Sequence, residues 1–268
     1  LIILTGPTAV GKTKLSISLA QAVNGAIISA DSMQVYRHMD IGSAKIRPEE
    51  MCGVPHYLID VLDPSEEFHV VKFVELAHEA MEKIYAAGQI PIVTGGTGFY
   101  IQALLKEVDF TESQGELPIR KQLEEKAATE EGAAELYREL SEVDPASAET
   151  IHPNNVKRVI RALEYYHETG QKISEHNEEQ KQKESPYCSA YFVLNDERSI
   201  LYDRIDRRVD QMICDGLVDE VFRLKEMGYT RDLVSMQGLG YKELFPYLAG
   251  ECTLEEAVYI IKRDTRHF

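Results

Sequence analysis

The 268-residue chain has no tryptophan, only four cysteines and far fewer basic than acidic residues. No stretch approaches the roughly 18 uninterrupted apolar residues of a membrane-spanning helix, so we expect no membrane partner. No charged-then-apolar leader opens the chain, and the scattered cysteines form no C-x-x-C pair. These absences favour reduced thiols, no zinc site and a cytoplasmic location.

The shortage of basic residues gives the chain a formal net charge of −16. This charge disfavours extended binding to nucleic acid, because phosphate backbones are bound mainly through lysine and arginine. A local basic face can still operate on an acidic protein. The charge therefore restricts where a nucleic acid could bind without excluding one.

The most informative motif is a glycine-rich loop, Gly6-Pro7-Thr8-Ala9-Val10-Gly11-Lys12-Thr13, which fits the phosphate-binding pattern G-x-x-x-x-G-K-[ST]. The apolar run before it, residues 1–4, predicts a buried parallel strand. The apolar residues after it recur at helical spacing. A strand, a loop and a helix in this order aim backbone N–H groups and the positive end of a helix dipole at one anion. The P-loop therefore predicts a bound phosphate or diphosphate.

The pattern of apolar residues predicts an α/β fold with an insertion. Short apolar runs alternate with amphipathic helices, which is typical of a parallel sheet. We expect a P-loop NTPase-like parallel sheet flanked by helices, formed by residues 1–110 and 186–268, with an inserted all-helical domain at residues 111–185. The expected strands are residues 1–4, 26–29, 57–61, 90–93 and 190–194, and a helix is expected over residues 70–84.

Polar residues follow two of the expected strands. Asp31 comes after residues 26–29, and Thr97 lies in a second glycine-rich turn after residues 90–93. Ligands of open α/β sheets bind beyond the carboxyl ends of the strands, so the P-loop, Asp31 and Thr97 could share one cleft. From the residues alone, Asp31 could bind Mg²⁺ through water, act as a general base or cap the next helix. Thr97 could face an anion or belong to an ordinary tight turn.

Two further acidic residues follow the third expected strand. Asp60 resembles the aspartate that holds Mg²⁺ in many P-loop enzymes, although a structural role is the favoured interpretation. Asp63 precedes a proline, which predicts a turn.

The basic residues gather in short helical clusters. Surface arginines usually pair with nearby acids, so a solvated face is the simpler interpretation for any one of them. The clusters are Lys157 with Arg158 and Arg161, Arg204 with Arg207 and Arg208, and Lys262 with Arg263 and Arg266.

Six blocks of the chain resemble the tRNA dimethylallyltransferases, also called tRNA isopentenyltransferases. They are the P-loop and residues 29–36, 39–45, 95–100, 152–164 and 237–243, in the order of that family. The blocks span nearly the whole chain, and the set is specific although the P-loop alone is generic. The family usually continues into a basic helix that this chain does not contain, which concerns only the tRNA contacts of such a helix.

The resemblance implies a reaction and its parts. A dimethylallyl group would pass from dimethylallyl diphosphate to N6 of the adenosine that is 3′-adjacent to the anticodon in tRNA, with release of diphosphate. The P-loop would bind that diphosphate rather than ATP, and Mg²⁺ would be the cofactor with Thr13 as a ligand. Asp31 would be the general base, and Thr97, Arg208 and Lys12 would stabilise charge on the departing oxygen.

The resemblance also implies two stretches that meet the tRNA. The helical insertion would grip the anticodon stem-loop, and the target base would leave its stack to reach the general base. A monomer is expected. The implied tRNA-binding residues are Asp31, Ser32, Met33, Gln34 and Thr97 in one stretch and Lys157, Arg158, Val159, Ile160 and Arg161 in the other.

Three other functions stay open from the residues. An adenylate isopentenyltransferase would act on the free nucleotide, although the helical insertion and its basic face favour RNA. A small-molecule kinase would use the same P-loop to bind ATP productively. A non-enzymatic RNA-binding module would have no use for a P-loop beside Asp31.

Overall fold

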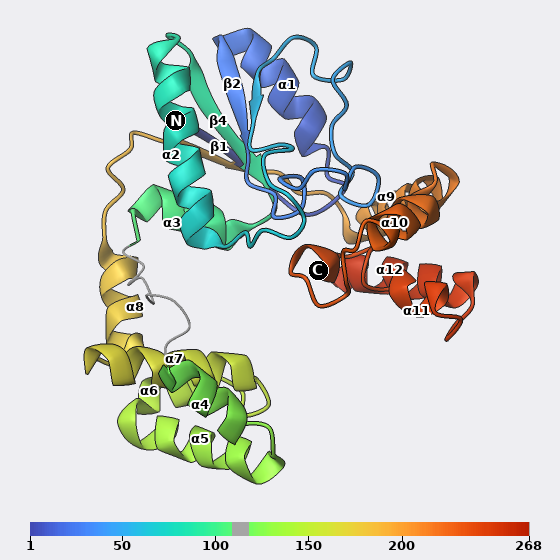
Figure 1. Ribbon diagram of the computed structural model, residues 1–268. Helices are drawn as coiled ribbons and strands as arrows, with labels where there is room; N and C mark the ends of the chain where they lie inside the picture. The colour runs from blue at the N-terminus through green and yellow to red at the C-terminus, as the bar shows by residue number, and fades with distance from the viewer. Residues whose placement is uncertain (109–117, 268) are drawn as a thin grey trace. The chain divides into compact units, whose positions relative to one another are not determined.

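The computed structural model describes residues 1–108 and 118–267, which form two compact units (Figure 1). The first unit contains Leu1–Leu105 and Tyr187–Phe268, and the second contains Lys106–Pro186. Of the two borders predicted from the sequence, the one between residues 110 and 111 lies outside the described residues. The other, between residues 185 and 186, lies one residue from the end of the second unit.

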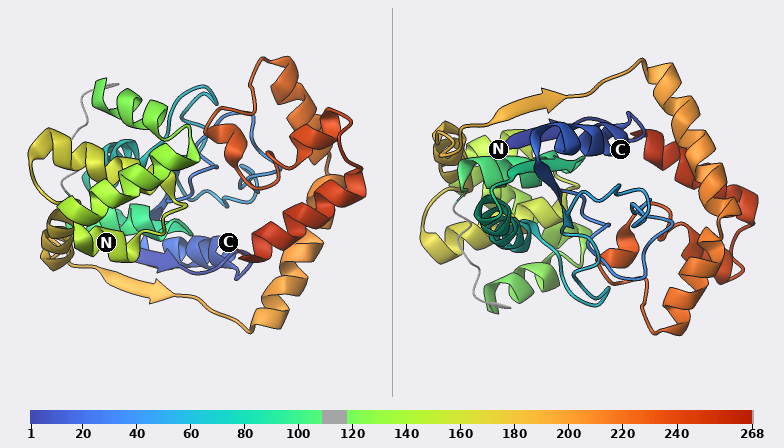
Figure 2. Two further views of the ribbon diagram at one scale, coloured as in Figure 1. Left: turned by 90° about the horizontal axis from the view of Figure 1, so that it is seen from below. Right: turned by 90° about the horizontal axis from the view of Figure 1, so that it is seen from above.

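A parallel sheet of five strands forms the centre of the first unit, which confirms the expected fold class. The strand order is β3-β2-β4-β1-β5, and β5 is the outermost strand in both views of Figure 2. Apolar side chains fill the three inner strands as continuous runs, because both faces of the sheet are covered there. The strands are β1 (Ile2–Thr5), β2 (Gly25–Ser29), β3 (His56–Tyr57), β4 (Ile90–Gly95) and β5 (Ala190–Val193).

The third expected strand, residues 57–61, is wrong over most of its length. Leu58 and Asp60 have left-handed backbone conformations, with φ of 63° and 55°. Such angles cannot continue a strand. The chain turns instead to run beside an earlier loop, where the amide of Val61 donates to the carbonyl of Val35.

Helices cover both faces of the sheet. Successive side chains of a strand point to opposite faces, so Ile27 packs in a small cluster with the first helix of the chain. Ala26 and Ile28 pack in a larger cluster with the second helix and with the helices that follow β5. The helices of this unit are α1 (Lys12–Val23), α2 (Val70–Ala86), α3 (Gly98–Lys106), α9 (Arg198–Cys214), α10 (Leu217–Glu226), α11 (Leu244–Leu248) and α12 (Leu254–His267), with a short 3-10 helix, η1 (Ser235–Gln237).

The second unit is a bundle of helices with its own apolar core. Every regular element in its described part is a helix, as the sequence predicts. Leu136, Leu140 and Leu163 are fully buried where α5 and α7 pack together. The helices are α4 (Pro118–Lys126), α5 (Glu130–Val143), α6 (Pro145–Thr150), α7 (Val156–Thr169) and α8 (Ile173–Gln182).

A buried carboxylate fastens α8 to α6 inside this second unit. Asp144 caps α6 and accepts hydrogen bonds from the amide and hydroxyl of Ser147, at 3.1 and 2.7 Å. The amide and hydroxyl of Ser174 donate to it at 3.0 and 2.6 Å. Burial alone would raise the pKa of Asp144, but the hydrogen bonds from Ser174 and Ser147 outweigh burial and lower it. The charged form is therefore the one that stabilises the fold.

We expect Asp144→Asn to lower the free energy of unfolding by about 1–3 kcal/mol near neutral pH, because buried donors of the two serines lose their acceptor. Since the folded-state pKa is lowered, the carboxylate stabilises the protein above its unfolded pKa, and this effect disappears as the pH falls through the folded pKa. Urea unfolding of parent and variant should therefore converge in strongly acidic buffer. A difference that stays constant from neutral to acidic pH would contradict this assignment.

Candidate active site

A cavity of about 830 Å³ lies at the carboxyl ends of the parallel strands in the first unit. Three loops that follow strands line it, namely the P-loop after β1, residues 31–34 after β2 and residues 96–97 after β4. Arg208 on α9 lines it as well, together with the loop at residues 237–240. The structure thus gathers the P-loop, Asp31, Thr97 and Arg208 around one space.

The P-loop is shaped so that its amides point away from protein acceptors. Gly6 has a φ of 150°, and a Cβ there would lie 2.5 Å from the carbonyl oxygen of Leu194. Gly11 caps α1 with a φ of 99°. Among the hydrogen bonds of the described residues, no amide from residues 8–14 donates to a protein acceptor, and the first turn of α1 carries no acidic side chain. Unpaired amides at a helix N-terminus form an anion site.

Lys12 completes this anion site. Its Nζ donates to the carbonyl oxygens of Gly6 and Pro7, both at 2.8 Å. Burial lowers the pKa of Lys12, while the charge of Asp31 raises it and the charge of Arg208 lowers it further. Phosphate oxygens could replace the two carbonyls as partners of the ammonium.

Arg208 is the member of its basic cluster that faces the cavity. Burial lowers the pKa of its guanidinium, and the nearby charge of Asp31 opposes that shift. Within the described part of the chain, the Arg208 side chain has no hydrogen bond or ion pair with the protein. Arg204, one helical turn earlier, instead pairs with Asp196 at 2.9 Å. A partly buried cation without a protein partner favours an anionic ligand.

Asp31 uses one carboxylate oxygen for structure and leaves the other available. Its Oδ1 accepts from the amides of Met33 and Gln34, at 2.8 and 3.3 Å. This is the capping role that the sequence left open. Its Oδ2 has no partner among the described residues. Asp31 can therefore cap the turn and still accept a proton from a ligand.

Thr97 and Thr13 both present side chains to the cavity. The carbonyl of Thr97 accepts the amides of Tyr100 and Ile101 at the start of α3, so its backbone serves the turn. The Thr13 hydroxyl has no protein partner in the part that the structure describes. That part also holds no cluster of three or more histidine, cysteine or acidic side chains suited to a metal. Because Mg²⁺ keeps several waters and binds substrate phosphates, a single hydroxyl beside the anion site fits this ion.

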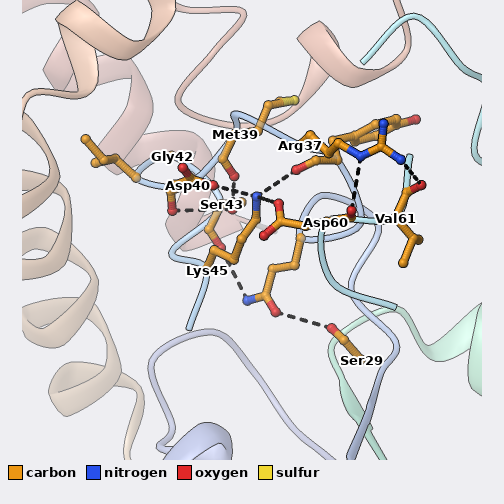
Figure 3. A network of polar contacts seen from close by, with 12 residues as sticks. Ser29, Arg37, Met39, Asp40, Gly42, Ser43, Lys45, Asp60 and Val61 are labelled. Atoms are coloured by element: carbon orange, nitrogen blue, oxygen red, sulfur yellow. Dashed lines mark hydrogen bonds and ion pairs between the residues drawn. The ribbon is translucent and has the colours of Figure 1, made fainter. Parts of the chain in front are cut away.

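A polar network behind the cavity gives Asp60 a structural partner (Figure 3). Lys45 has only 4% of its side chain exposed, and its Nζ contacts the carboxylates of Asp40 and Asp60 at 2.6 and 2.5 Å. The same Nζ donates to the carbonyl of Tyr36 at 2.7 Å. This arrangement agrees with the structural interpretation of Asp60.

Asp63 forms the predicted turn. The amide and hydroxyl of Ser65 donate to its Oδ1 at 2.9 and 2.6 Å, and the hydroxyl of Tyr229 donates to its Oδ2 at 2.9 Å. Asp63 does not line the cavity. Its carboxylate therefore holds loops together away from the site.

The basic stretch of the second unit lies on α7. Lys157 and Arg158 are exposed and have no ion pair among the described residues. Val159 and Ile160 are buried in the core of the bundle, which leaves their side chains no surface for an RNA. Arg161 pairs at 3.0 Å with the glutamate three residues later. Contacts from this stretch would therefore come from its three basic residues.

An aromatic wall of the cavity was not foreseen from the sequence. Tyr36, Phe68 and Tyr100 line the cavity, and the ring of Phe68 makes edge-to-face contacts with the other two, at centroid distances of 6.4 and 5.5 Å. Both tyrosines lie in blocks that carry the family resemblance. Phe68 lies in a loop without periodicity, so no sequence signal marked it.

Comparison with known proteins identifies the family. The family model described as IPP transferase matches residues 34–268. The chain belongs to the IPP transferase family. A tRNA dimethylallyltransferase of Lachnoclostridium phytofermentans is 66% identical over 268 residues, which is 100% of this chain and 85% of that protein.

Solved structures show that this IPP transferase shares its fold with relatives. A full-length tRNA isopentenylpyrophosphate transferase from Bacillus halodurans is 47% identical with a TM-score of 0.72, covering 99% of this chain and 82% of that one. A eukaryotic dimethylallyltransferase acting on tRNA is 36% identical with a TM-score of 0.85, covering 100% of this chain and 67% of that one. The P-loop α/β fold expected from the sequence is therefore confirmed.

We expect Arg208→Met to weaken binding of inorganic pyrophosphate by about tenfold or more, since a hydrogen bond from a charged group contributes about 1.5–3 kcal/mol. Arg204→Met is the matched control, because it removes the same charge from the same helix but from a residue that pairs with Asp196. Its affinity should stay within about twofold of the parent. Calorimetric titration with pyrophosphate and Mg²⁺ measures both, and equal losses in the two variants would refute the assignment of Arg208.

Proposed function

We propose that this chain transfers the dimethylallyl group of dimethylallyl diphosphate to N6 of the adenosine 3′-adjacent to the anticodon in tRNA, releasing diphosphate. Membership of the IPP transferase family and the names of its relatives support this reaction. One observation of the structure carries it. An anion site with two cations shares a cavity with the available carboxylate oxygen of Asp31.

The anion site suits a departing diphosphate. As the bond between carbon and oxygen breaks, negative charge grows on the leaving oxygen, and its electron pair stays with the diphosphate. The P-loop amides, Lys12 and Arg208 are fixed in a partly buried site, where they stabilise that charge more than water does. Thr97 lines the same cavity and would add its hydroxyl. Thr13 would hold Mg²⁺, which when bound neutralises part of the diphosphate charge.

Asp31 is suited to the role of general base. The lone pair of an exocyclic adenine amine is delocalised into the ring, so the amine is a poor nucleophile. Transfer of its proton to Asp31 as the new C–N bond forms would contribute about 10²–10⁴-fold to the rate. Because Oδ1 already caps the turn, Oδ2 is the oxygen that would take the proton.

The aromatic wall suits the five-carbon group. Tyr36, Phe68 and Tyr100 offer apolar ring surface in the same cavity as the anion site. Burial of the hydrocarbon against these rings would contribute about 25 cal/mol per Å². It would also keep water away from the reacting carbon.

The partners proposed for the chain are tRNA and the prenyl diphosphate, and we propose that it acts as a monomer. Ser32 and Met33 line the cavity and would meet the target base. Lys157 and Arg158 would meet the phosphates of the anticodon stem-loop from the helical unit. No helix in the described residues is long and apolar enough to span a membrane, so no membrane partner is proposed.

We expect Asp31→Asn to lower the rate of label transfer from dimethylallyl diphosphate to an anticodon stem-loop by at least about 10²-fold. Asparagine keeps an oxygen that can accept the amides of Met33 and Gln34, so the turn stays capped while the base is lost. The affinity for the stem-loop should be nearly unchanged. Turnover close to that of the parent would remove Asp31 as the base.

We expect Lys157→Ala combined with Arg158→Ala to weaken binding of the stem-loop and to flatten its salt dependence by about one logarithmic unit per lost phosphate contact. Lys172→Ala combined with Lys181→Ala is the matched control, since both lysines belong to the same unit and pair with glutamates. Titrations at several salt concentrations measure the slopes. If the first double variant keeps the parent slope, the α7 face does not contact RNA.

A further inference from the structure

A buried carboxylate joins two loops at the wall of the cavity. The loops are residues 31–45 and residues 237–243, and parts of both line the cavity. Glu220 on α10 is 2% exposed and accepts the three consecutive amides of residues 40–42, at 3.0, 2.8 and 3.1 Å. It also accepts the hydroxyl of Tyr241 at 2.8 Å. One side chain thus satisfies donors from both loops.

The two loops are shaped to fit one another around this carboxylate. A Cβ at Gly42 would lie 2.5 Å from the ring of Tyr241, and a Cβ at Gly238 would overlap the side chain of Met33. Burial raises the pKa of the Tyr241 hydroxyl, and the charge of Glu220 raises it further. The hydroxyl therefore stays protonated and remains a donor to Glu220.

A continuous series of hydrogen bonds leads from this junction to Asp31. The carbonyls of Ser43 and Ala44, next to the amides that Glu220 accepts, accept Nε2 of Gln34 at 3.4 and 3.3 Å (Figure 3). The backbone amide of Gln34 donates to Oδ1 of Asp31 at 3.3 Å. The turn that Asp31 caps is therefore anchored through Gln34 to the backbone that Glu220 holds.

We propose that Glu220 is a positioning residue for the transfer reaction. By fixing the backbone of residues 40–42, it holds Gln34 and so the turn capped by Asp31, which orients the carboxylate toward the amine of the bound adenosine. Glu220 does not line the cavity and touches neither substrate. The inference rests on the proposed role of Asp31, whereas the hydrogen-bonded path can be tested without it.

The first test is amide hydrogen exchange in Glu220→Gln, which keeps the shape but replaces one acceptor oxygen with an NH₂ group. We expect faster exchange at residues 40–42 and also at the amides of Met33 and Gln34, with no change in α1. Asp63→Asn is the matched control, because its carboxylate also accepts a tyrosine hydroxyl and a backbone amide but does not line the cavity. Faster exchange confined to residues 40–42 would overturn the proposal, whether or not the parent enzyme transfers label.

The second test separates positioning from simple loss of fold. Glu220→Gln should lower kcat by about 10–100-fold, as expected for a misplaced catalytic group, with KM for dimethylallyl diphosphate within about twofold. It should still bind one pyrophosphate per chain, and Glu220→Asp should recover part of kcat. An unchanged kcat, or a kcat that falls only in proportion to the pyrophosphate-binding fraction, would overturn the proposal. If Glu220→Gln does not fold, Tyr241→Phe replaces it with the same expected pattern at smaller size.

Discussion

The site depends on an imbalance of charge in a partly dry cavity. Lys12 and Arg208 are both desolvated, and Asp31 is the one carboxylate whose charge acts on both. Together with the unpaired amides of the P-loop, they leave a surplus of positive charge that an anion can neutralise. The same surplus would stabilise a departing diphosphate, so binding and leaving-group stabilisation have a common physical origin. The acidic remainder of the chain would not provide such a site.

The architecture around this site could be predicted from local patterns. Buried parallel strands are continuous apolar runs, and the helix at Val70–Ala86 shows its apolar face at spacings of three and four. The third strand could not be predicted in the same way. Its apolar run continues past Tyr57, but the left-handed angles at Leu58 and Asp60 depend on tertiary partners, including the buried Lys45. Local propensity lost to long-range hydrogen bonding there.

The candidate site divides in a similar way. Strand ends place the P-loop, Asp31 and Thr97 together by a topological rule, and the sequence predicts that grouping. Helical spacing puts Arg204 and Arg208 on one face, yet Arg204 pairs with Asp196 and Arg208 lines the cavity. Glu220 gave no sequence signal, because a single acid on an amphipathic helix usually faces solvent, and the backbone amides that it accepts are about 180 residues away. Such assignments need the three-dimensional contacts.

A crystal structure with inorganic pyrophosphate and Mg²⁺ bound would test the central claim, that the surplus positive charge of this cavity is a diphosphate site. The account predicts an anion on the amides of residues 8–13, with Lys12 turned from the carbonyls of Gly6 and Pro7 to a phosphate oxygen and Arg208 in hydrogen-bond contact with it. Pyrophosphate bound elsewhere, or bound in the loop while Lys12 and Arg208 keep their present positions, would contradict the account.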